Sequence, residues 1–454
     1  MLVLRRRGYV SEHLTLDAET QADLELFGEE GSLFAFLNRC RTDGGKAALA
    51  ARMARPWVRP EQILDTQAAI EFISGHKEVF SELPSEYVAL NVERYASAVM
   101  PMVRQTGPLE FAMASFSFWA NDDHFYTKII RGVQLSCRLL AGVRSFADRL
   151  AATQPPGELA PLLAELKRCL AKFEDVGDYD EARWFWRKLR LDQQLRMNEK
   201  ATLTRTLEIL YQIDALVALA DITAEHGFIL PTIIDGPVAV HAEGLVHPLV
   251  SAPVANPIAL DETRRVLFLT GPNMAGKTTY LRAVATAIYM AQLGMGVPAR
   301  SFRFVPIRQL LTSIAVQDDL NEGISFFRAE ALRMKAIAAT VAAEEPALAI
   351  MDEPFKGTNV KDAFDASLAV LQRFAGSTHC RFIVSSHLIE LGDALGDTPG
   401  MCYHHFEAEE EEDRLQFDYT LREGVSDQRL GMRVLKEEGV FDLLDAIQNP
   451  EDAI

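Results

Sequence analysis

The stretch Gly271-Pro-Asn-Met-Ala-Gly276-Lys277-Thr278 decides the fold of the second half of this chain. A glycine, four free positions and then Gly-Lys-Thr form the pattern of a loop that binds nucleotide phosphates. The apolar run 265–270 predicts a short buried strand before the loop, and residues 279–292 predict a helix after it. Because the free N–H groups and the dipole at a helix N-terminus attract anions, this order of elements indicates a phosphate site.

The residues of this loop suit ATP bound together with Mg²⁺. We expect Lys277 to reach the β- and γ-phosphates and to assist catalysis, and the Thr278 hydroxyl to hold Mg²⁺. The predicted nucleotide-binding residues of the loop are Gly271, Pro272, Asn273, Met274, Ala275, Gly276, Lys277, Thr278 and Thr279.

Two later apolar runs, 347–351 and 381–385, predict further buried strands that lead into polar residues. After the first run, Asp352 is placed to bind Mg²⁺, and Glu353 is placed to polarise a water for attack on the γ-phosphate. After the second run, His387 is placed to contact the γ-phosphate. A lone histidine is more often a satisfied surface or core residue, so this assignment depends on the other two motifs.

Composition narrows the class of protein. The chain of 454 residues is 48% hydrophobic and 24% charged, as in ordinary globular proteins, and its net charge is −18. This acidic balance argues against a general basic face that grips duplex DNA, although a local basic patch stays open. No apolar run is long enough to span a membrane, and no signal-peptide pattern is present. Five scattered cysteines predict free thiols and a cytoplasmic location.

The hydrophobic pattern changes along the chain. Apolar residues recur at helical spacing in the first part, whereas short Val/Ile/Leu/Phe runs alternate with helices from about residue 236. The predicted fold class is therefore α + α/β with a mainly parallel sheet. We divide the chain into an N-terminal extension (1–24), a helical domain (25–235) and an α/β domain (236–454). The acidic run 407–413 is interpreted as the solvated tip of a β-hairpin rather than as a metal site.

The three motifs follow the order used by ABC-type P-loop ATPases, and their details resemble the MutS family of mismatch-repair ATPases. The Gly-Pro-Asn-Met core of the phosphate loop is far more specific than the general pattern. Other likenesses, looser in the first half, are carried by His247-Pro-Leu249, Ala255-Asn-Pro257, the signature segment 318–330, Asp352-Glu353 with Gly357-Thr358, Ser386-His387 with Glu390-Leu391, 424–431, 31–45, 55–71 and 213–231.

This resemblance implies a core and lever domain followed by an ATPase domain with a helical dimerisation element at its end. Members form homodimers with two composite nucleotide sites, in which ATP closes the dimer and hydrolysis releases it. Ser325 would cross the interface to the partner's γ-phosphate, Asn273 would approach the γ-phosphate side, and His405 would stack on adenine. The resemblance also implies action on mismatched or branched DNA, in mismatch repair or recombination.

The chain also departs from the mismatch-repair members of the family. We expect the domain that reads a mismatch, a full DNA clamp and a nuclease domain to be missing. Pro354-Phe355-Lys356 replaces Ile-Gly-Arg, and Phe326 replaces a threonine of the signature; neither change removes a catalytic group.

One stretch could contact DNA directly. Between Arg183 and Lys200, basic residues alternate with aromatic ones, a pattern that can bind phosphates and stack on bases. The interpretation that we favour is an amphipathic lever helix with Trp184 or Trp186 in the core, and the run 116–119 is likewise interpreted as core. The second hypothesis for function is therefore an ATP-switched interaction module, whose helical half binds another protein without direct DNA recognition.

Overall fold

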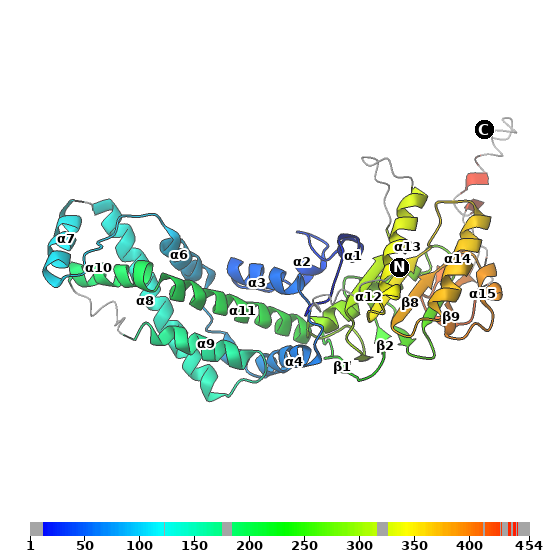
Figure 1. Ribbon diagram of the computed structural model, residues 1–454, viewed down its shortest axis with the longest axis horizontal. Helices are drawn as coiled ribbons and strands as arrows, with labels where there is room; N and C mark the ends of the chain where they lie inside the picture. The colour runs from blue at the N-terminus through cyan, green and yellow to red at the C-terminus, as the bar shows by residue number, and fades with distance from the viewer. Residues whose placement is uncertain are drawn as a thin grey trace, which may run out of the picture.

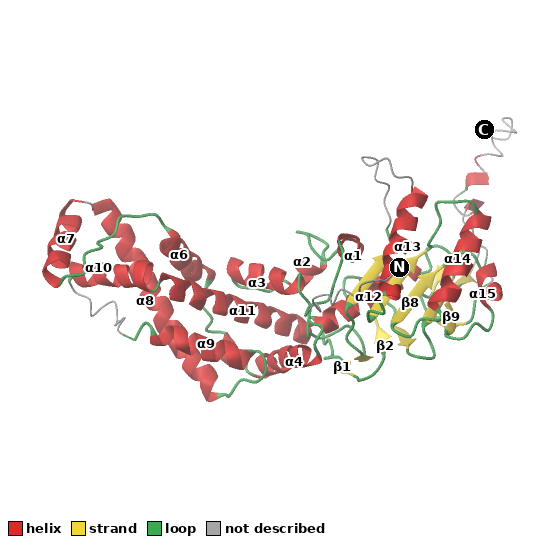
Figure 2. Cartoon of the chain, in the orientation of Figure 1, coloured by secondary structure: helices red, strands yellow, loops and turns green. Residues whose placement is uncertain are grey.

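The computed structural model describes residues 12–121, 123–174, 184–315, 326–411, 414–426, 428, 435–436, 439–441 and 443. The molecule is elongated, with a helical arm at one end and a layered α/β domain at the other (Figure 1). Figure 2 shows that the strands gather in the second of these parts. The predicted α + α/β fold class is thereby confirmed. Across the described ranges, none of the helices has the length and apolar character that crossing a membrane requires.

The arm is built around the long helix α11 (Lys200–Glu225), most of whose core-facing side chains are fully buried because α3, α4, α6 and α9 pack against it. Hydroxyls of Ser32 and Thr42 cap α2 and α3 by accepting hydrogen bonds from backbone N–H groups. The remaining helices of the first part are α1 (Ala18–Asp23), α2 (Leu33–Leu37), α3 (Asp43–Met53), α4 (Pro60–Gly75), α5 (Lys77–Phe80), α6 (Glu86–Ser97), α7 (Pro108–Asn121), α8 (Asp123–Ala152), α9 (Leu159–Ala171) and α10 (Phe185–Gln193), with a π-helical turn over Gln194–Asn198.

The α/β domain contains a six-stranded sheet in the order β12-β9-β4-β8-β7-β6. All pairs in it are parallel except β12 with β9, and β4 and β8 are buried along their whole length, as the apolar runs predict. Its strands are β4 (Val266–Thr270), β6 (Gln309–Ser313), β7 (Ala347–Asp352), β8 (Cys380–Ser385), β9 (Met401–His405) and β12 (Arg422–Glu423). Its helices are α12 (Lys277–Gln292), α13 (Phe326–Ala342), α14 (Val360–Phe374) and α15 (Glu390–Leu395).

Two smaller sheets complete the domain. The first has the order β1-β5-β2-β3, with β1 (Thr232–Ile233), β2 (Val240–Leu245), β3 (Asn256–Leu260) and β5 (Ser301–Phe304). The second is the antiparallel pair β10 (Ala408–Glu411) and β11 (Arg414–Phe417). The acidic run therefore lies in a β-hairpin, as expected, although most of the run forms the strand β10 rather than only the turn.

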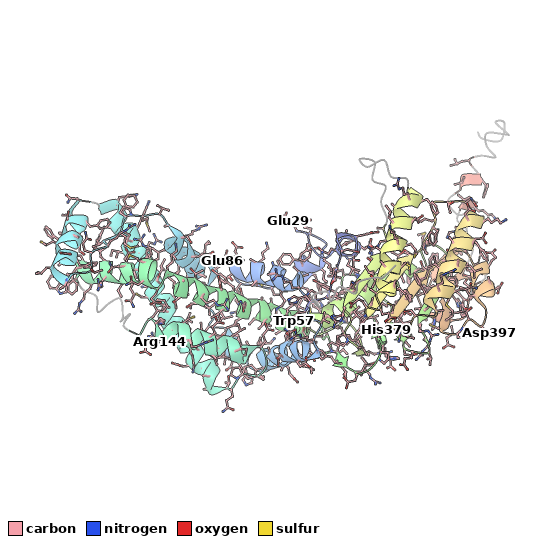
Figure 3. All side chains as sticks on the ribbon, in the orientation of Figure 1. Glu29, Trp57, Glu86, Arg144, His379 and Asp397 are labelled. Carbon is pink, nitrogen blue, oxygen red and sulfur yellow. The ribbon has the colours of Figure 1, made fainter. Side chains whose placement is uncertain are left out.

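Helix α12 joins the two parts of the molecule. Its C-terminal end is buried against the helical arm: the Tyr289 hydroxyl donates to the Met53 carbonyl at 2.6 Å, and Gln292 Nε2 donates to the Trp57 carbonyl at 2.8 Å. Trp57 N donates back to the Gln292 carbonyl at 2.8 Å. Figure 3 shows Trp57 at this junction, between the arm and the sheet. The two parts therefore share one hydrophobic core instead of meeting through a bare linker.

The first described residues contact both the base of the arm, where Leu14 N donates to the Pro56 carbonyl at 2.8 Å, and the main six-stranded sheet. Thr15 forms a parallel bridge with Gln309 at the edge strand β6. The buried Asp23 carboxylate accepts hydrogen bonds from the Thr312 hydroxyl, Ile314 N and Ala315 N at 2.6, 2.8 and 2.9 Å. In this way α1 covers the end of β6.

The far end of the arm differs from the sequence prediction. Trp184 is 63% exposed and Trp186 39%, so neither lies in the core. Phe116 and Trp119 are also exposed, and the Trp119 ring stacks on Phe185 with centroids 5.5 Å apart. Phe116, Trp119 and Phe185 contact one another where α7 and α10 pack together at the end of the arm, and no further layer of described residues covers them. The interpretation of both aromatic runs as core is therefore wrong for these four side chains.

The basic residues of the same stretch do not form one continuous charged face. Arg196 is buried in an ion pair with Asp192 at 2.6 Å, and it also donates to the carbonyls of Met100 and Pro101. Arg187 lies over the Trp186 ring at 5.5 Å. Arg183 lies outside the described residues. Arg196 thus serves the packing of the arm and has no free donor pair for a phosphate.

Candidate nucleotide site

The phosphate loop joins β4 to α12, as the sequence predicts, and the helix begins two residues earlier than expected, at Lys277. Gly271 (φ +137°) and Gly276 (φ +97°) adopt conformations that side chains disfavour. A Cβ at Gly271 would lie 2.6 Å from the Phe406 carbonyl oxygen, and one at Gly276 would lie 3.1 Å from the Tyr419 ring. Both positions therefore require glycine, because Phe406 and Tyr419 approach the phosphate loop closely.

Lys277 is buried at the base of this loop. Its Nζ donates to the carbonyls of Gly271 and Pro272 at 2.8 and 3.0 Å, and lies 3.9 Å from Glu353 Oε1. Burial lowers the pKa of Lys277, while the carboxylates of Glu353 and Asp352 act in the opposite direction. The ammonium group is thus held at the mouth of the loop by carbonyl oxygens that a phosphate oxygen can replace.

Asp352, at the end of β7, lies next to the start of α12. Its Oδ2 accepts from the Thr278 hydroxyl at 2.5 Å, and its Oδ1 accepts from the Ser385 hydroxyl at the end of β8. The two residues predicted to hold Mg²⁺ are therefore in direct contact, although they are 74 positions apart in the sequence. A carboxylate and a hydroxyl, completed by phosphate oxygens and water, are donors that suit Mg²⁺. The donor set fits this ion.

Glu353 lies between the Lys277 ammonium group and the His387 imidazole ring. Its Oε1 faces Lys277, and its Oε2 lies 3.8 Å from His387 Nδ1, whose side chain is exposed. Its backbone is left-handed (φ +51°), and its N–H donates to the Ser385 carbonyl at 3.2 Å. The turn after β7 therefore directs the second carboxylate of the pair away from Asp352 and toward His387.

A cavity of about 720 Å³ opens above the phosphate loop. Loop residues Asn273, Met274, Gly276, Lys277, Thr278 and Thr279 line it, together with Asp352 and Glu353. Its lining also includes His247, Val254, Tyr280, Phe406 and Tyr419. The cavity thus combines the polar groups expected around phosphates with aromatic rings, and its volume is in the range of small-molecule sites.

Tyr419 is a candidate residue that the sequence prediction missed. Its ring lies against Gly276, and its carbonyl accepts from Asn256 Nδ2 at 2.9 Å. Asn256 Oδ1 accepts from Leu421 N at 2.7 Å, so one buried amide fixes both sides of the residue Thr420. The signal available in the sequence was Ala255-Asn256-Pro257, but nothing local to that motif points to residue 419.

His405 does not line this cavity. It is buried on β9, and its Nε2 lies 2.9 Å from Glu407 Oε1. Because neighbouring side chains of an extended chain point in opposite directions, Phe406 reaches the cavity and His405 turns away from it. The geometry thus gives no support to the expectation that His405 stacks on adenine.

The buried Glu330 carboxylate organises the loop after β7. Its two oxygens accept from the backbone N–H groups of Lys356 and Gly357 at 3.1 and 3.0 Å. Phe355, one of the family departures, is buried beside it in a left-handed conformation. Ser325 lies outside the described residues, as does most of the signature segment 318–330.

All five cysteines are unpaired, as predicted. No group of three or more metal-ligating side chains that could hold an ion by themselves was found within the described ranges. The candidate Mg²⁺ site differs from such a cluster, because a hydroxyl and one carboxylate need the oxygens of the nucleotide to complete it.

Comparison with known families agrees with this geometry. A family model described as MutS domain III matches residues 13–220, and one described as MutS domain V matches residues 267–448. The chain is 35% identical over 230 residues to "DNA mismatch repair protein MutS" of Listeria monocytogenes serotype 4b, which covers 49% of this chain and 26% of that protein. It is 34% identical over 234 residues to the protein of the same name from Brevibacillus brevis, covering 50% of this chain and 27% of the relative.

The two family matches leave little of the chain uncovered, although the aligned part spans only about a quarter of each of these relatives. The first match covers the helical arm, and the second covers the sheet, the phosphate loop and both carboxylates. The chain belongs to the MutS family.

Proposed function

We propose that this chain is a Mg²⁺-dependent ATP hydrolase, whose ATP cycle opens and closes a homodimer that acts on DNA in mismatch repair or recombination. The observation that carries the hydrolase part is the position of Glu353. Its carboxylate lies between Lys277 and His387 and next to the Asp352–Thr278 pair. A nucleophile, a phosphate and a metal can therefore meet at one point.

In the proposed reaction, Lys277 exchanges its loop carbonyls for oxygens of the β- and γ-phosphates. Thr278 and Asp352 would hold Mg²⁺, which neutralises phosphate charge when bound. Glu353 orients a water and accepts its proton as the water oxygen attacks the γ-phosphorus and the bond to the β–γ bridging oxygen breaks. His387 contacts the γ-phosphate of the same subunit's nucleotide. Ser325 contacts the γ-phosphate of the nucleotide that the partner subunit binds. Tyr419, rather than His405, covers the adenine.

A second candidate function is an ATP-switched module that binds another protein without recognising DNA. The exposed end of the arm favours it. Besides its tryptophans, this surface exposes Leu109 and Met113, which cannot stack on bases as aromatic rings do. The net charge of −18 also opposes general attraction to DNA.

Steady-state ATP hydrolysis, measured with and without duplex, mismatched and branched DNA at one fixed salt concentration, tests the proposal. We expect turnover that needs Mg²⁺, is lost in Lys277→Ala, and changes with at least one DNA. DNA binding should weaken steeply with salt, because each phosphate contact releases a counterion. Turnover that ignores every DNA would leave the hydrolase in place and favour the protein-binding module. Full turnover in Lys277→Ala would contradict the hydrolase assignment itself.

A further inference from the structure

A second cavity lies at the amino ends of the strands of the main sheet, whereas the nucleotide site lies at their carboxyl ends. Its volume is about 560 Å³, and its lining includes Arg265 just before β4, Pro346 just before β7, and Thr378, His379 and Arg381 around the start of β8. Because β4, β7 and β8 are parallel, these residues share the amino ends of the strands, whereas the phosphate loop follows a carboxyl end. Figure 3 labels His379 at this edge.

Arg381 is the unusual group in this cavity. Its side chain is completely buried, yet only Nη1 has hydrogen-bond partners, the carbonyls of Thr378 and Cys380 at 3.2 and 2.8 Å. Nε and Nη2 are buried and have no partner among the described residues. Buried N–H donors that lack an acceptor cost free energy, and more so when they belong to a charged group. A fold that keeps an arginine in this state has an acceptor missing.

The neighbouring charges do not supply that acceptor. Glu262 lines the same cavity, but within the described ranges Nε and Nη2 of Arg381 have no hydrogen-bond partner, Glu262 included. The Arg265 guanidinium also faces the cavity, and its own donors are used by the carbonyls of Ala375, Glu262 and Pro399. Burial and the nearby Arg265 charge lower the pKa of Arg381, while Asp261 and Glu262 oppose this. The Asp261 carboxylate is itself bound by Arg264.

We propose that this cavity binds a small organic anion, whose carboxylate or phosphate group accepts hydrogen bonds from Nε and Nη2 of Arg381. These two nitrogens form one edge of the guanidinium plane, which can hold two oxygens of the same group. Pro237, Val305 and Pro306 line the rest of the cavity and contact the apolar body of the ligand. The volume suits a small molecule, which contacts Nε and Nη2 by displacing the side-chain atoms that cover them.

Phenyl phosphate and benzoate test this site, because they share an apolar ring and differ in the anionic group. Binding is measured by calorimetry and by thermal shift on the full chain carrying Lys277→Ala, which removes phosphate binding at the nucleotide loop. We expect at least one of the two anions to bind, and neutral benzamide not to bind. Which anion binds more tightly distinguishes a phosphate ligand from a carboxylate ligand. If neither binds at millimolar concentration, the proposal is wrong.

The substitution that decides the matter is Arg381→Met in the same background. It should abolish binding of the anion, whereas Arg373→Met, which removes an exposed arginine on α14, should leave binding unchanged. Should Arg381→Met not fold, His379→Glu places a carboxylate at the exposed rim and should weaken binding at least about tenfold. Binding that survives in Arg381→Met, or that His379→Glu leaves unchanged, would overturn the proposal. None of these measurements depends on ATP hydrolysis, so they stand apart from the proposed function.

Discussion

Two adjacent carboxylates at the end of β7 have different surroundings, and this separates their roles. Asp352 accepts hydrogen bonds from two hydroxyls, which fixes it as an oxygen donor, whereas Glu353 faces the Lys277 ammonium group and the His387 ring across longer gaps of 3.9 and 3.8 Å. Glu353→Gln should therefore keep nucleotide affinity and slow turnover by about 10²–10⁴-fold, the usual contribution of a general base. Phosphate release and nucleotide binding are measured together. Glu344→Gln, at an exposed position before the same strand, should change neither quantity. Normal turnover in Glu353→Gln would remove Glu353 from the mechanism.

Tyr419 allows a test that separates binding from chemistry. Because its backbone is left-handed (φ +55°), asparagine is the replacement that tolerates the conformation while removing the ring. Tyr419→Asn should raise KM for ATP by about tenfold or more, since stacking of a base on a ring contributes about 1–3 kcal/mol, and should change kcat little. Tyr419→Phe keeps the ring and should behave like the unchanged chain. An unchanged KM in Tyr419→Asn would show that adenine lies elsewhere.

Two partly buried thiols make the stability of the fold sensitive to alkaline pH. Burial raises the pKa of Cys40 and of Cys402 from 9.0 to about 12. Above pH 9 the unfolded chain loses these protons while the folded chain keeps them, so stability falls as pH rises toward 12. Each thiol contributes up to about 1.4 kcal/mol per pH unit in this window. Urea unfolding between about pH 8 and pH 10 measures the slope, which should be shallower in a chain carrying Cys40→Ala and Cys402→Ala. Equal slopes in the unchanged chain and the double variant would show that these two thiols do not cause the loss of stability.

At the scale of elements, α1 is held to the main sheet by Asp23. Its carboxylate satisfies two backbone N–H groups at the end of β6, where the chain enters the signature segment. Asp23→Ala leaves those donors buried without an acceptor, which should cost about 2–4 kcal/mol of unfolding free energy. Glu25→Ala, two residues on, removes a more exposed ion pair with Arg282 and should cost less than about 1 kcal/mol. Urea unfolding compares them, and similar costs would show that Asp23 does not anchor α1.

The elements also show what sequence could and could not predict. Loop residues 271–278 are contiguous, and the strands that lead to Asp352 and to His387 are short apolar runs, so local pattern was sufficient for them. Tyr419 reaches the cavity only because Asn256 holds its backbone, a contact across 163 positions that no local signal encodes. Trp184 shows the opposite error: an aromatic residue in a helical pattern suggests core, but whether another layer covers it is decided by the packing of the whole arm.

At the scale of the molecule, α12 is the physical link between the nucleotide and the arm. It begins at Lys277 and ends at Gln292, whose side chain bonds the carbonyls of both Trp57 and Ile307. A helix of this length moves as a rigid unit, so a shift at its phosphate end is carried to the junction. The N-terminal half lies at the candidate nucleotide site, and the C-terminal half lies at the base of the arm.

Trp57 can report such a movement. A chain carrying Trp119→Phe, Trp184→Phe and Trp186→Phe keeps Trp57 as its sole tryptophan. If α12 couples the two parts, a non-hydrolysable ATP analogue should change the fluorescence of Trp57, because the ring lies in the junction with its Nε1 donating to Thr66 at 3.2 Å. Gln292→Leu removes the side-chain link to Trp57 while leaving the phosphate loop unchanged, so the analogue should still bind but the fluorescence change should shrink. A full change in Gln292→Leu would show that the signal reaches the arm by another route, through α1 and β6, and the same measurement in Asp23→Ala would then locate it.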